Sequence, residues 1–380
     1  MNVTLPLSLT IPDELIEEIM LKLPVKSLIR FKCLSKSFLF IISDPQFAKS
    51  HFNLSAAPTY RLLNFNKDYE LNAIDIDAPL HDDSAQVVFN SLHPSCLPNR
   101  GRMVQIVGSC RGFILLQIKQ FNEINFSLNL ASFVIWNPST GLHKQIMYNE
   151  LMHHSRRLCG IGYDSSIDDY VVALVTTQSQ NTMRIQCFSF RKKSWKVYEH
   201  NVVYYYPICS LNGEFLNGAL HWLVGSYDNL NIVILALNVK ENTLLEIALP
   251  YDLTSGLELE RYFLYPLGVI GECLCLCFMN RETRMLETWT MKDYNVPSSW
   301  TKSFVLSRHL NTLSVFYPIC FTANGQILGT DGDGMLAKFN DKGEFLEHRI
   351  YEKHGIKDLL YNGFYKETLL SLPEDIERGE

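Results

Sequence analysis

A β-strand pattern that recurs every 47 to 54 residues constrains the fold of this chain more than any other feature of its sequence. Each unit contains an apolar strand, a polar hairpin and a further strand, as in SFVIWNPSTGLHKQI, IQCFSFRKKSWKVY and IVILALNVKENTLLEI. The last large apolar residues before the hairpins are Trp136, Phe190, Leu237, Trp289 and Phe339. Repeated strands at this period, without amphipathic helices between them, predict a β-propeller and argue against a helical solenoid.

A propeller must close its ring, because an open first or last blade leaves unpaired strand edges. Tyr60–Phe65 is an apolar strand without a blade of its own, and so is 367–372 near the other end of the chain. We predict that these two strands share one blade, which gives five full blades and one composite blade. Seven blades remain the alternative to six, because the pattern is weak between residues 66 and 103. Residues 81–100, rich in Asp, Ser, Asn and Pro, are expected to form a long loop.

The chain begins differently, with helical periodicity between residues 11 and 47. Pro12 suits the first position of a helix, and Pro24 ends that helix. The apolar residues between them recur on one helical face: Leu15, Ile16, Ile19, Met20 and Leu23. Two more short helical periods follow. Three helices of this size cannot bury all their apolar surface among themselves, so the remainder must face the rest of this chain or another protein.

The stretch IPDELIEEIMLKLPVKSLIRFKCLSKSF…IISDPQF resembles the F-box motif, and its PVKSLIRFKCLSKSF core resembles the plant version. The motif begins Leu-Pro and ends its core with Trp, whereas this chain has Ile11 and Phe38, which are also apolar. Downstream, GSCRGFILL, VIWNPSTG, GIGYDSSIDDYVV, SFRKKSWKV, LNGALHWLV, LGVIGECLCL and WTMKDYNVPSSWTKSF resemble the F-box-associated region of plant F-box/kelch-repeat proteins. These stretches follow the order found in that family.

The resemblance implies a fold class and a set of partners. The expected fold is a small all-α F-box of three helices followed by an all-β propeller of six kelch-like blades, closed by N- and C-terminal strands. The expected domains are the F-box at 8–52, a linker at 53–59, the propeller at 60–373 and a polar tail at 374–380. The F-box would bind a Skp-type adaptor and, through it, the cullin and RING subunits of a ubiquitin ligase. The propeller would bind a target protein, which the sequence does not identify.

Eight residues are expected to contact the adaptor: Pro12, Leu15, Ile16, Ile19, Leu23, Pro24, Val25 and Leu28. Phe31, Cys33 and Leu34 are expected to hold the three helices together. Because the propeller would close through its own end strands, the spare apolar surface of the helices is expected to face another protein. Candidate target-binding loops are the longer irregular stretches at 81–100, 149–157, 178–182 and 251–262.

Several motifs have a spacing similar to that of catalytic or metal-binding sites, but each is better explained as a turn, a strand or a loop. Gly108–Gly112 (GSCRG) has the spacing of a nucleophile elbow, but a strand follows it, so a tight turn with a buried Cys110 is expected. Cys273, Cys275 and Cys277 alternate along one strand, and no second cysteine pair completes a zinc site. The glycine-rich run at 329–334 lacks calcium-loop spacing and predicts a hairpin. The His153-His154 pair is expected to be a solvated loop feature.

No catalytic residue, cofactor or metal site is therefore predicted. Two alternatives remain open: a propeller enzyme or glycan-binding module whose F-box serves regulation, and an adaptor-bound scaffold that acts without cullin. A net charge of −6 without runs of like charge argues against a nucleic-acid partner. No apolar run is long enough to span a membrane. Without a recognisable signal peptide, the ten cysteines are expected to be free thiols, and the protein to lie in the cytoplasm, the nucleus or both.

Overall fold

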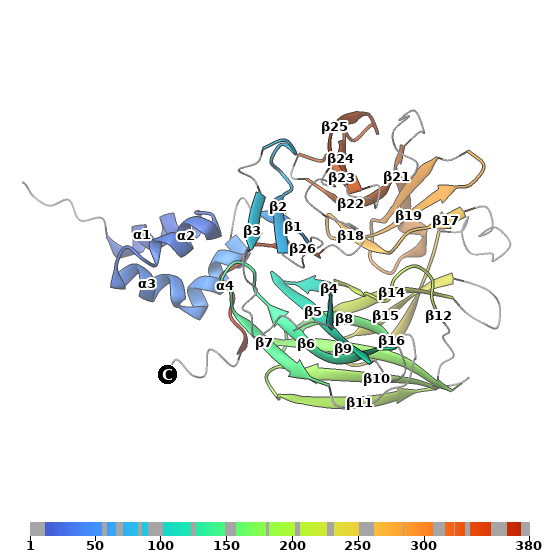
Figure 1. Cartoon of the computed structure of the whole chain (residues 1–380), viewed down its shortest axis with the longest axis horizontal. Helices are drawn as coiled ribbons and strands as arrows, with labels where there is room; N and C mark the ends of the chain where they lie inside the picture. The colour runs from blue at the N-terminus through green and yellow to red at the C-terminus, as the bar shows by residue number, and fades with distance from the viewer. Residues whose placement is uncertain are drawn as a thin grey trace, which may run out of the picture.

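The protein is seen here as a computed structural model. It describes residues 12–54, 59–65, 71–82, 86–89, 102–122, 127–148, 157–179, 182–201, 206–225, 232–250, 262–283, 285–306, 316–322, 324–330, 335–350 and 363–373. Within these residues, four short helices precede six β-sheets that surround a common axis (Figure 1). No helix in this described part is long and apolar enough to cross a membrane.

Each sheet is one antiparallel propeller blade. The second and third blades contain β4 (Arg102–Cys110), β5 (Phe113–Asn122), β6 (Ser127–Trp136) and β7 (His143–Met147), then β8 (Leu158–Asp164), β9 (Asp169–Ser179), β10 (Thr182–Ser189) and β11 (Ser194–His200). The fourth contains β12 (Tyr206–Pro207), β13 (Glu214–Leu216), β14 (Ala219–Gly225), β15 (Ile232–Asn238) and β16 (Leu244–Ala248).

The fifth blade contains β17 (Tyr262–Leu264), β18 (Gly268–Ile270), β19 (Cys273–Asn280), β20 (Leu286–Met291) and β21 (Trp300–Leu306). The sixth contains β22 (Tyr317–Phe321), β23 (Ile327–Thr330), β24 (Met335–Phe339) and β25 (Phe345–Ile350). In the fourth and fifth blades the innermost strand is split, because β12 and β13 both pair with β14, and β17 and β18 both pair with β19. The innermost strands contact one another in the order β26, β4, β8, β13, β18 and β22.

The first blade is composite, as predicted, and the number of blades is six. Its strand order is β26 (Gly363–Lys366), β1 (Tyr60–Phe65), β2 (Leu71–Asp75) and β3 (Gln86–Phe89), so the C-terminal strand is innermost. β26 and β1 run antiparallel, with Lys366 opposite Tyr60. Two boundary predictions are wrong. The closing strand ends at Lys366 and does not occupy 367–372, and the expected loop at 81–100 contains β3.

Tight hairpins connect the first two strands of several blades. Between β4 and β5, Arg111 and Gly112 have φ angles of 50° and 84°, the pattern of a two-residue turn that matches strand twist. The GSCRG motif is therefore a hairpin, as predicted, and Cys110 is buried. Burial raises the pKa of the Cys110 thiol well above its usual range, so the group stays protonated and is no nucleophile. A Cβ on Gly112 would lie 2.2 Å from Thr368 Cγ2, so only glycine fits where the C-terminal segment crosses.

The N-terminal helices are α1 (Asp13–Leu21), α2 (Val25–Phe31), α3 (Lys36–Ser43) and α4 (Pro45–Leu54), one more than predicted. Ser35 caps α3, since its hydroxyl accepts a hydrogen bond from the Phe38 amide at 3.1 Å. Asp44 does the same for α4, where its carboxylate accepts from the Phe47 amide at 2.8 Å. The fourth helix lies between the other three and the propeller (Figure 1). It therefore determines how the helical module attaches.

Candidate functional site

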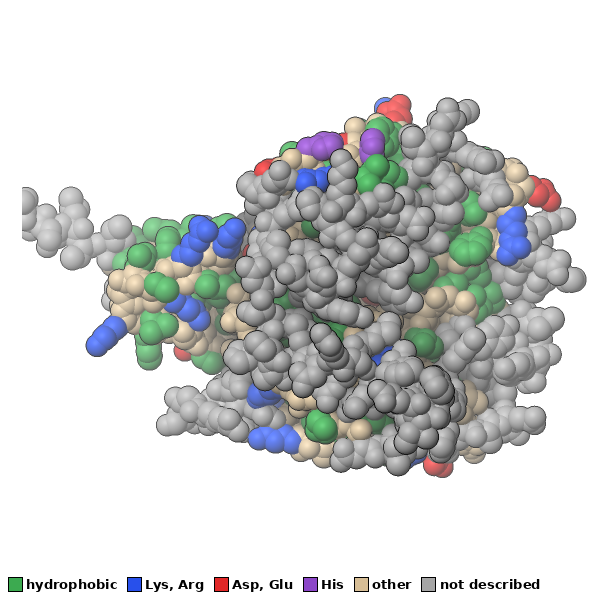
Figure 2. Space-filling view, viewed as in Figure 1, with side chains coloured by type: hydrophobic (Ala, Val, Ile, Leu, Met, Phe, Trp, Pro, Cys, Tyr) green, Lys and Arg blue, Asp and Glu red, His purple; other side chains and the backbone are tan. Residues whose placement is uncertain are grey.

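The helical module leaves several large apolar side chains exposed to solvent. Leu15 and Ile19 on α1 are 50% and 53% exposed, and Phe40 on α3 is 77% exposed. Leu34 and Leu39 are also exposed. Hydrophobic side chains and scattered lysines and arginines are visible on this module at the left of Figure 2. We refer to Leu15, Ile19, Leu34, Leu39 and Phe40 as the apolar residues of the module surface.

The eight residues predicted to contact a partner divide into three groups. Pro12, Leu15, Ile19 and Pro24 are exposed, whereas Ile16 and Leu23 are partly buried against the module's core. Val25 and Leu28 are buried, at 4% and 0% exposure, which leaves almost no surface for another protein. In this chain the two side chains belong to the buried hydrophobic cluster, and the set of residues that contact an adaptor stays a prediction.

The residues expected to hold the helices together also need correction. Phe31 is partly buried and stacks on Phe38 with a centroid separation of 6.1 Å, as such a residue should. Cys33 and Leu34, however, are exposed. They lie at the turn between α2 and α3, where an apolar side chain has no neighbouring helix to cover it.

The core of the helical module is continuous with that of the propeller. Met20, Val25, Leu28, Ile42 and Phe47 belong to one buried hydrophobic cluster with residues of the second and third blades and with Leu369, Leu370 and Leu372. The expectation that the propeller leaves the spare surface of the helices to another protein is therefore only partly right. One part of the helices' apolar surface packs against the propeller of this chain, and the apolar residues of the module surface stay exposed.

A second set of contacts, which we call the junction, joins α4 to the blades through two cations. The Arg111 guanidinium lies between the rings of Phe52 and Tyr163, at 4.5 and 4.2 Å from their centroids. Lys366 Nζ lies 4.2 Å from the centre of the Phe52 ring and donates to the Phe52 carbonyl at 2.9 Å. Cation–π contacts of this kind contribute about 0.5 to 2 kcal/mol each, depending on desolvation.

An ion pair lies beside the junction. Lys49 Nζ on α4 is 2.6 Å from one carboxylate oxygen of Asp168, and the Tyr163 hydroxyl donates to the other at 2.6 Å. Partial burial alone would raise the pKa of Asp168, but these two hydrogen bonds hold it below its usual range. Desolvation and the Asp168 carboxylate raise the pKa of Tyr163 to about 12. Asp168 is therefore ionised and Tyr163 protonated at neutral pH.

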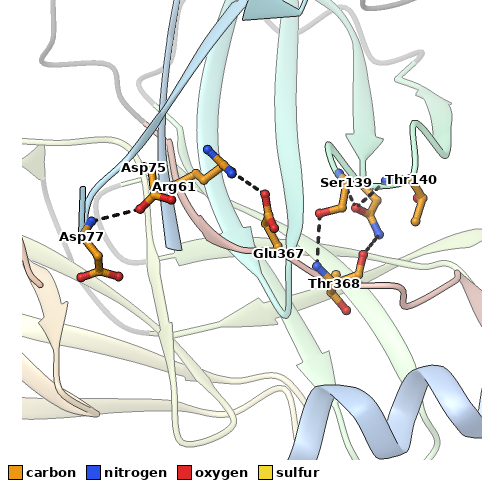
Figure 3. A network of polar contacts seen from close by, with 8 residues as sticks. Arg61, Asp75, Asp77, Ser139, Thr140, Glu367 and Thr368 are labelled. Carbon is orange, nitrogen blue, oxygen red and sulfur yellow. Dashed lines mark hydrogen bonds and ion pairs between the residues drawn. The ribbon is translucent and has the colours of Figure 1, made fainter. Parts of the chain in front are cut away.

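The C-terminal residues 367–372, which we call the closing segment, connect the first blade, the second blade and the module (Figure 3). Glu367 forms a buried ion pair with Arg61 of β1. Asn137, in the β6–β7 hairpin, donates its amide to the Thr368 and Leu370 carbonyls at 3.2 and 3.0 Å. Ser139 Oγ accepts from the Thr368 amide at 3.2 Å. The Glu367 amide donates to the Thr59 carbonyl at 2.9 Å, side chains bind further backbone groups of the segment, and its three leucines are buried. These contacts explain an apolar sequence that is not a strand.

All these contacts lie at one end of the blades. The hairpins β4–β5, β6–β7 and β8–β9 and the end of β26 share that end because the strands alternate in direction. The connections from each outermost strand to the next blade leave from the opposite end. The candidate loops predicted from sequence lie mostly outside the described residues.

The described residues show no arrangement typical of catalysis. They contain no group of three or more His, Cys, Asp and Glu side chains that could hold a metal ion. Cys275 and Cys277 are buried on β19 with their sulfur atoms 4.0 Å apart. The neighbouring Cys277 thiol and burial raise the pKa of Cys275, so it is a packing residue. His153, His154 and the turn at 331–334 lie outside the described residues.

Comparison with known proteins gives two adjoining matches. A family model described as the F-box associated beta propeller domain matches residues 63–353, and the F-box domain model matches residues 8–50. The F-box protein CPR1 of Arabidopsis thaliana is 28% identical over 338 residues, covering 81% of this chain and 76% of the relative. An F-box/kelch-repeat protein of the same plant is 29% identical over 308 residues, covering 77% of this chain and 78% of the relative.

Proposed function

The chain belongs to the family of F-box proteins that carry an F-box-associated β-propeller, and from this premise we propose that it is the substrate-recognition subunit of a Skp–cullin–F-box ubiquitin ligase. The helical module binds a Skp-type adaptor, which connects it to the cullin and RING subunits. The propeller binds a target protein, through the connections between blades or its central opening. Such a subunit works in the cytoplasm, the nucleus or both.

The observation that carries this proposal is the exposure of apolar side chains on a module whose other apolar face is already packed. Leu15 and Ile19 lie four residues apart on α1, so they present one stripe to a partner. Covering exposed aliphatic surface of this size stabilises a complex by about 1 kcal/mol for each side chain. Pro12 and Pro24, exposed at the two ends of α1, border that stripe.

On this proposal the chain itself makes and breaks no bonds. It holds a target close to the ubiquitin-conjugating enzyme, so that transfer takes place at a high effective concentration. A continuous core, the junction and the closing segment fix the direction of the propeller relative to the adaptor.

The first prediction tests the adaptor surface with the double change Leu15→Asp and Ile19→Asp. Two carboxylates in the apolar stripe should reduce co-purification with a Skp-type adaptor by at least about tenfold, since burying an unpaired charge is costly. The matched control is Leu245→Asp, at an exposed position of β16 in the fourth blade. Circular dichroism and melting temperature confirm that the variants fold. Unchanged adaptor binding by the folded double variant would contradict the proposal.

The same purification separates the alternatives. A ligase subunit brings cullin and ubiquitylated proteins with the adaptor, whereas a scaffold brings the adaptor alone. An enzyme or glycan-binding module would bind a small molecule or a sugar with the double variant as well as with the wild type.

A further inference from the structure

Residues 76–82, which we call the strap, follow β2 of the first blade and pack against the sixth blade. Ile76 and Leu80 of the strap are buried, at 0% and 2% exposure. They belong to a hydrophobic cluster that the two blades share, with Leu62 and Ile74 from the first blade and Cys320, Leu328 and Leu336 from the sixth. The strap is therefore part of the boundary between the first blade and the last.

Charged side chains of the sixth blade bind the backbone of the strap. Lys338 and Glu347 are opposite each other in the β24–β25 pair. Lys338 Nζ donates to the Ala78 carbonyl at 2.6 Å and lies 3.3 Å from one carboxylate oxygen of Glu347. The other Glu347 oxygen accepts from the Leu80 amide at 3.1 Å, and Arg349 donates to the Leu80 carbonyl at 2.9 Å. Three charged groups thus hold a backbone segment that is 260 to 269 residues away in the sequence.

Lys338 is a charged group that the fold keeps out of water. Its side chain is 2% exposed, whereas that of Glu347 is 25% exposed. A buried ammonium is tolerated only when its donors have acceptors, and a displaced strap would take the Ala78 carbonyl away from it. The arrangement with the strap in place is therefore favoured over arrangements in which the strap has moved.

The strap also joins the two ends of the propeller. β1, β2 and the strap come from the N-terminal part of this domain, whereas β22, β23, β24, β25 and β26 come from its C-terminal part. The pairing of β26 with β1 closes the ring inside the first blade. The strap connects the same two parts again, at the two outer strands of the sixth blade.

We propose that the strap is a latch that closes the propeller ring a second time, and that Lys338 holds this latch shut. With the latch released, the N-terminal strands of the first blade separate from the sixth blade whenever the β26–β1 pairing opens. With the latch in place, both closures must be released together, so this opening is rarer than either event alone. The device belongs to the propeller, so it does not depend on whether the chain binds an adaptor.

Two buried cysteines report on the two faces of the sixth blade. Cys320 is 3% exposed and lies in the cluster at the boundary with the first blade. Cys275 is 2% exposed and lies in the cluster between the fifth and sixth blades. Burial raises the pKa of the Cys320 thiol well above its usual range, and burial and the Cys277 thiol do the same for Cys275. Each thiol therefore reacts with a reagent only after its own boundary has opened.

The test labels the full chain with N-ethylmaleimide at about pH 8 and follows each cysteine by mass spectrometry. Lys338→Met, which removes the ammonium and keeps a similar volume, should speed the labelling of Cys320 by at least about tenfold, because hydrogen bonds of a charged group are lost. The labelling of Cys275 should not change. The matched control Lys342→Met, at an exposed position of the β24–β25 hairpin, should label as the wild type does.

The pattern of labelling decides between the latch and its alternatives. If Cys320 in Lys338→Met labels at the wild-type rate, the strap is no latch. If Cys320 and Cys275 become faster together, the substitution has loosened the whole sixth blade, and the proposal is equally wrong.

A measurement on the wild type alone covers the case in which Lys338→Met fails to fold. Hydrogen exchange of the Leu80 amide reports release of the strap, and labelling of Cys320 reports separation of the blades. Because the latch must be released first, openings that expose Cys320 should be no more frequent than openings that expose the Leu80 amide. More frequent exposure of Cys320 would show that the blades separate with the strap in place, which would overturn the proposal.

Discussion

At the scale of single residues, the Arg61–Glu367 pair has the greatest effect on ring closure. Both side chains are more than 90% buried, and Arg61 Nη1 has no hydrogen-bond partner in the described structure. Removing one partner leaves the other charge buried and uncompensated, which costs about 3 to 5 kcal/mol. We therefore expect Glu367→Gln to lower the free energy of unfolding by about 3 kcal/mol in urea titration.

A double change provides the control for that prediction. Arg61→Met combined with Glu367→Leu removes both charges and fills similar volume, so it should recover most of the lost stability. If the single and the double variant lower the free energy of unfolding equally, the loss of stability comes from packing, and the ion pair contributes nothing.

His51 should make the stability of the helical module depend on pH, with lower stability at lower pH. Its Nε2 donates to the Leu23 carbonyl at 2.8 Å. Desolvation and the Lys366 charge lower the pKa of His51 below 6.5, although the bond to Leu23 opposes the shift. The unfolded chain thus takes up a proton at a higher pH than the folded chain, and the stability from neutral His51 is lost as pH falls below 6.5.

The variant His51→Gln isolates this contribution, because glutamine keeps an N–H donor and does not titrate. When the pH is lowered from about 8 to 5, the melting temperature of the variant should fall by less than that of the wild type. His348→Gln, on the exposed edge strand β25, should behave as the wild type. If the melting temperature of His51→Gln depends on pH as strongly as that of the wild type, His51 does not contribute to the pH dependence of stability.

At the scale of elements, the closing segment shows what periodicity can and cannot reveal. Its apolar run ETLLSL predicts burial, and Leu369, Leu370 and Leu372 are indeed buried. Burial alone does not specify a strand. The segment leaves the sheet after Lys366 because Asn137 and Ser139 bind its backbone and a helical module covers its leucines. Both partners are distant in sequence, so no local pattern could have predicted them.

The helices show the same limit. The spacing of Leu15, Ile16 and Ile19 correctly predicts a helix, although α1 ends at Leu21 and does not reach the predicted Leu23. Spacing cannot tell which apolar face packs inside. Val25 and Leu28 lie on the next helix, α2, and are buried in the hydrophobic cluster that the helices share with the propeller. The five full blades, in contrast, follow from a repeat that appears five times, so errors at single boundaries do not change their number. The pairing of β26 with β1 in the composite blade then decides for six blades over seven.

At the scale of the whole molecule, the junction is one of the contacts, beside the continuous core and the closing segment, that hold the module against the propeller. Arg111→Ala combined with Asp168→Asn removes the cation between Phe52 and Tyr163 and weakens the bond to Lys49. A loss of about 2 kcal/mol corresponds to about thirtyfold faster local opening. Hydrogen exchange should therefore speed up in α4 by roughly that factor and remain unchanged in the central strands of the blades.

A loosened junction should also uncouple two activities that a rigid molecule keeps together. Adaptor binding depends on the module surface and should be unaffected, whereas ubiquitin transfer to the target depends on a fixed distance and should fall. Lys192→Ala, in the exposed β10–β11 hairpin, is the matched control. Unchanged exchange in α4 would mean that the continuous core, with Phe47 and Leu370, fixes the orientation without the junction. In that case Leu370→Ala, which opens a cavity between module and propeller, should produce the uncoupling that the junction variant does not.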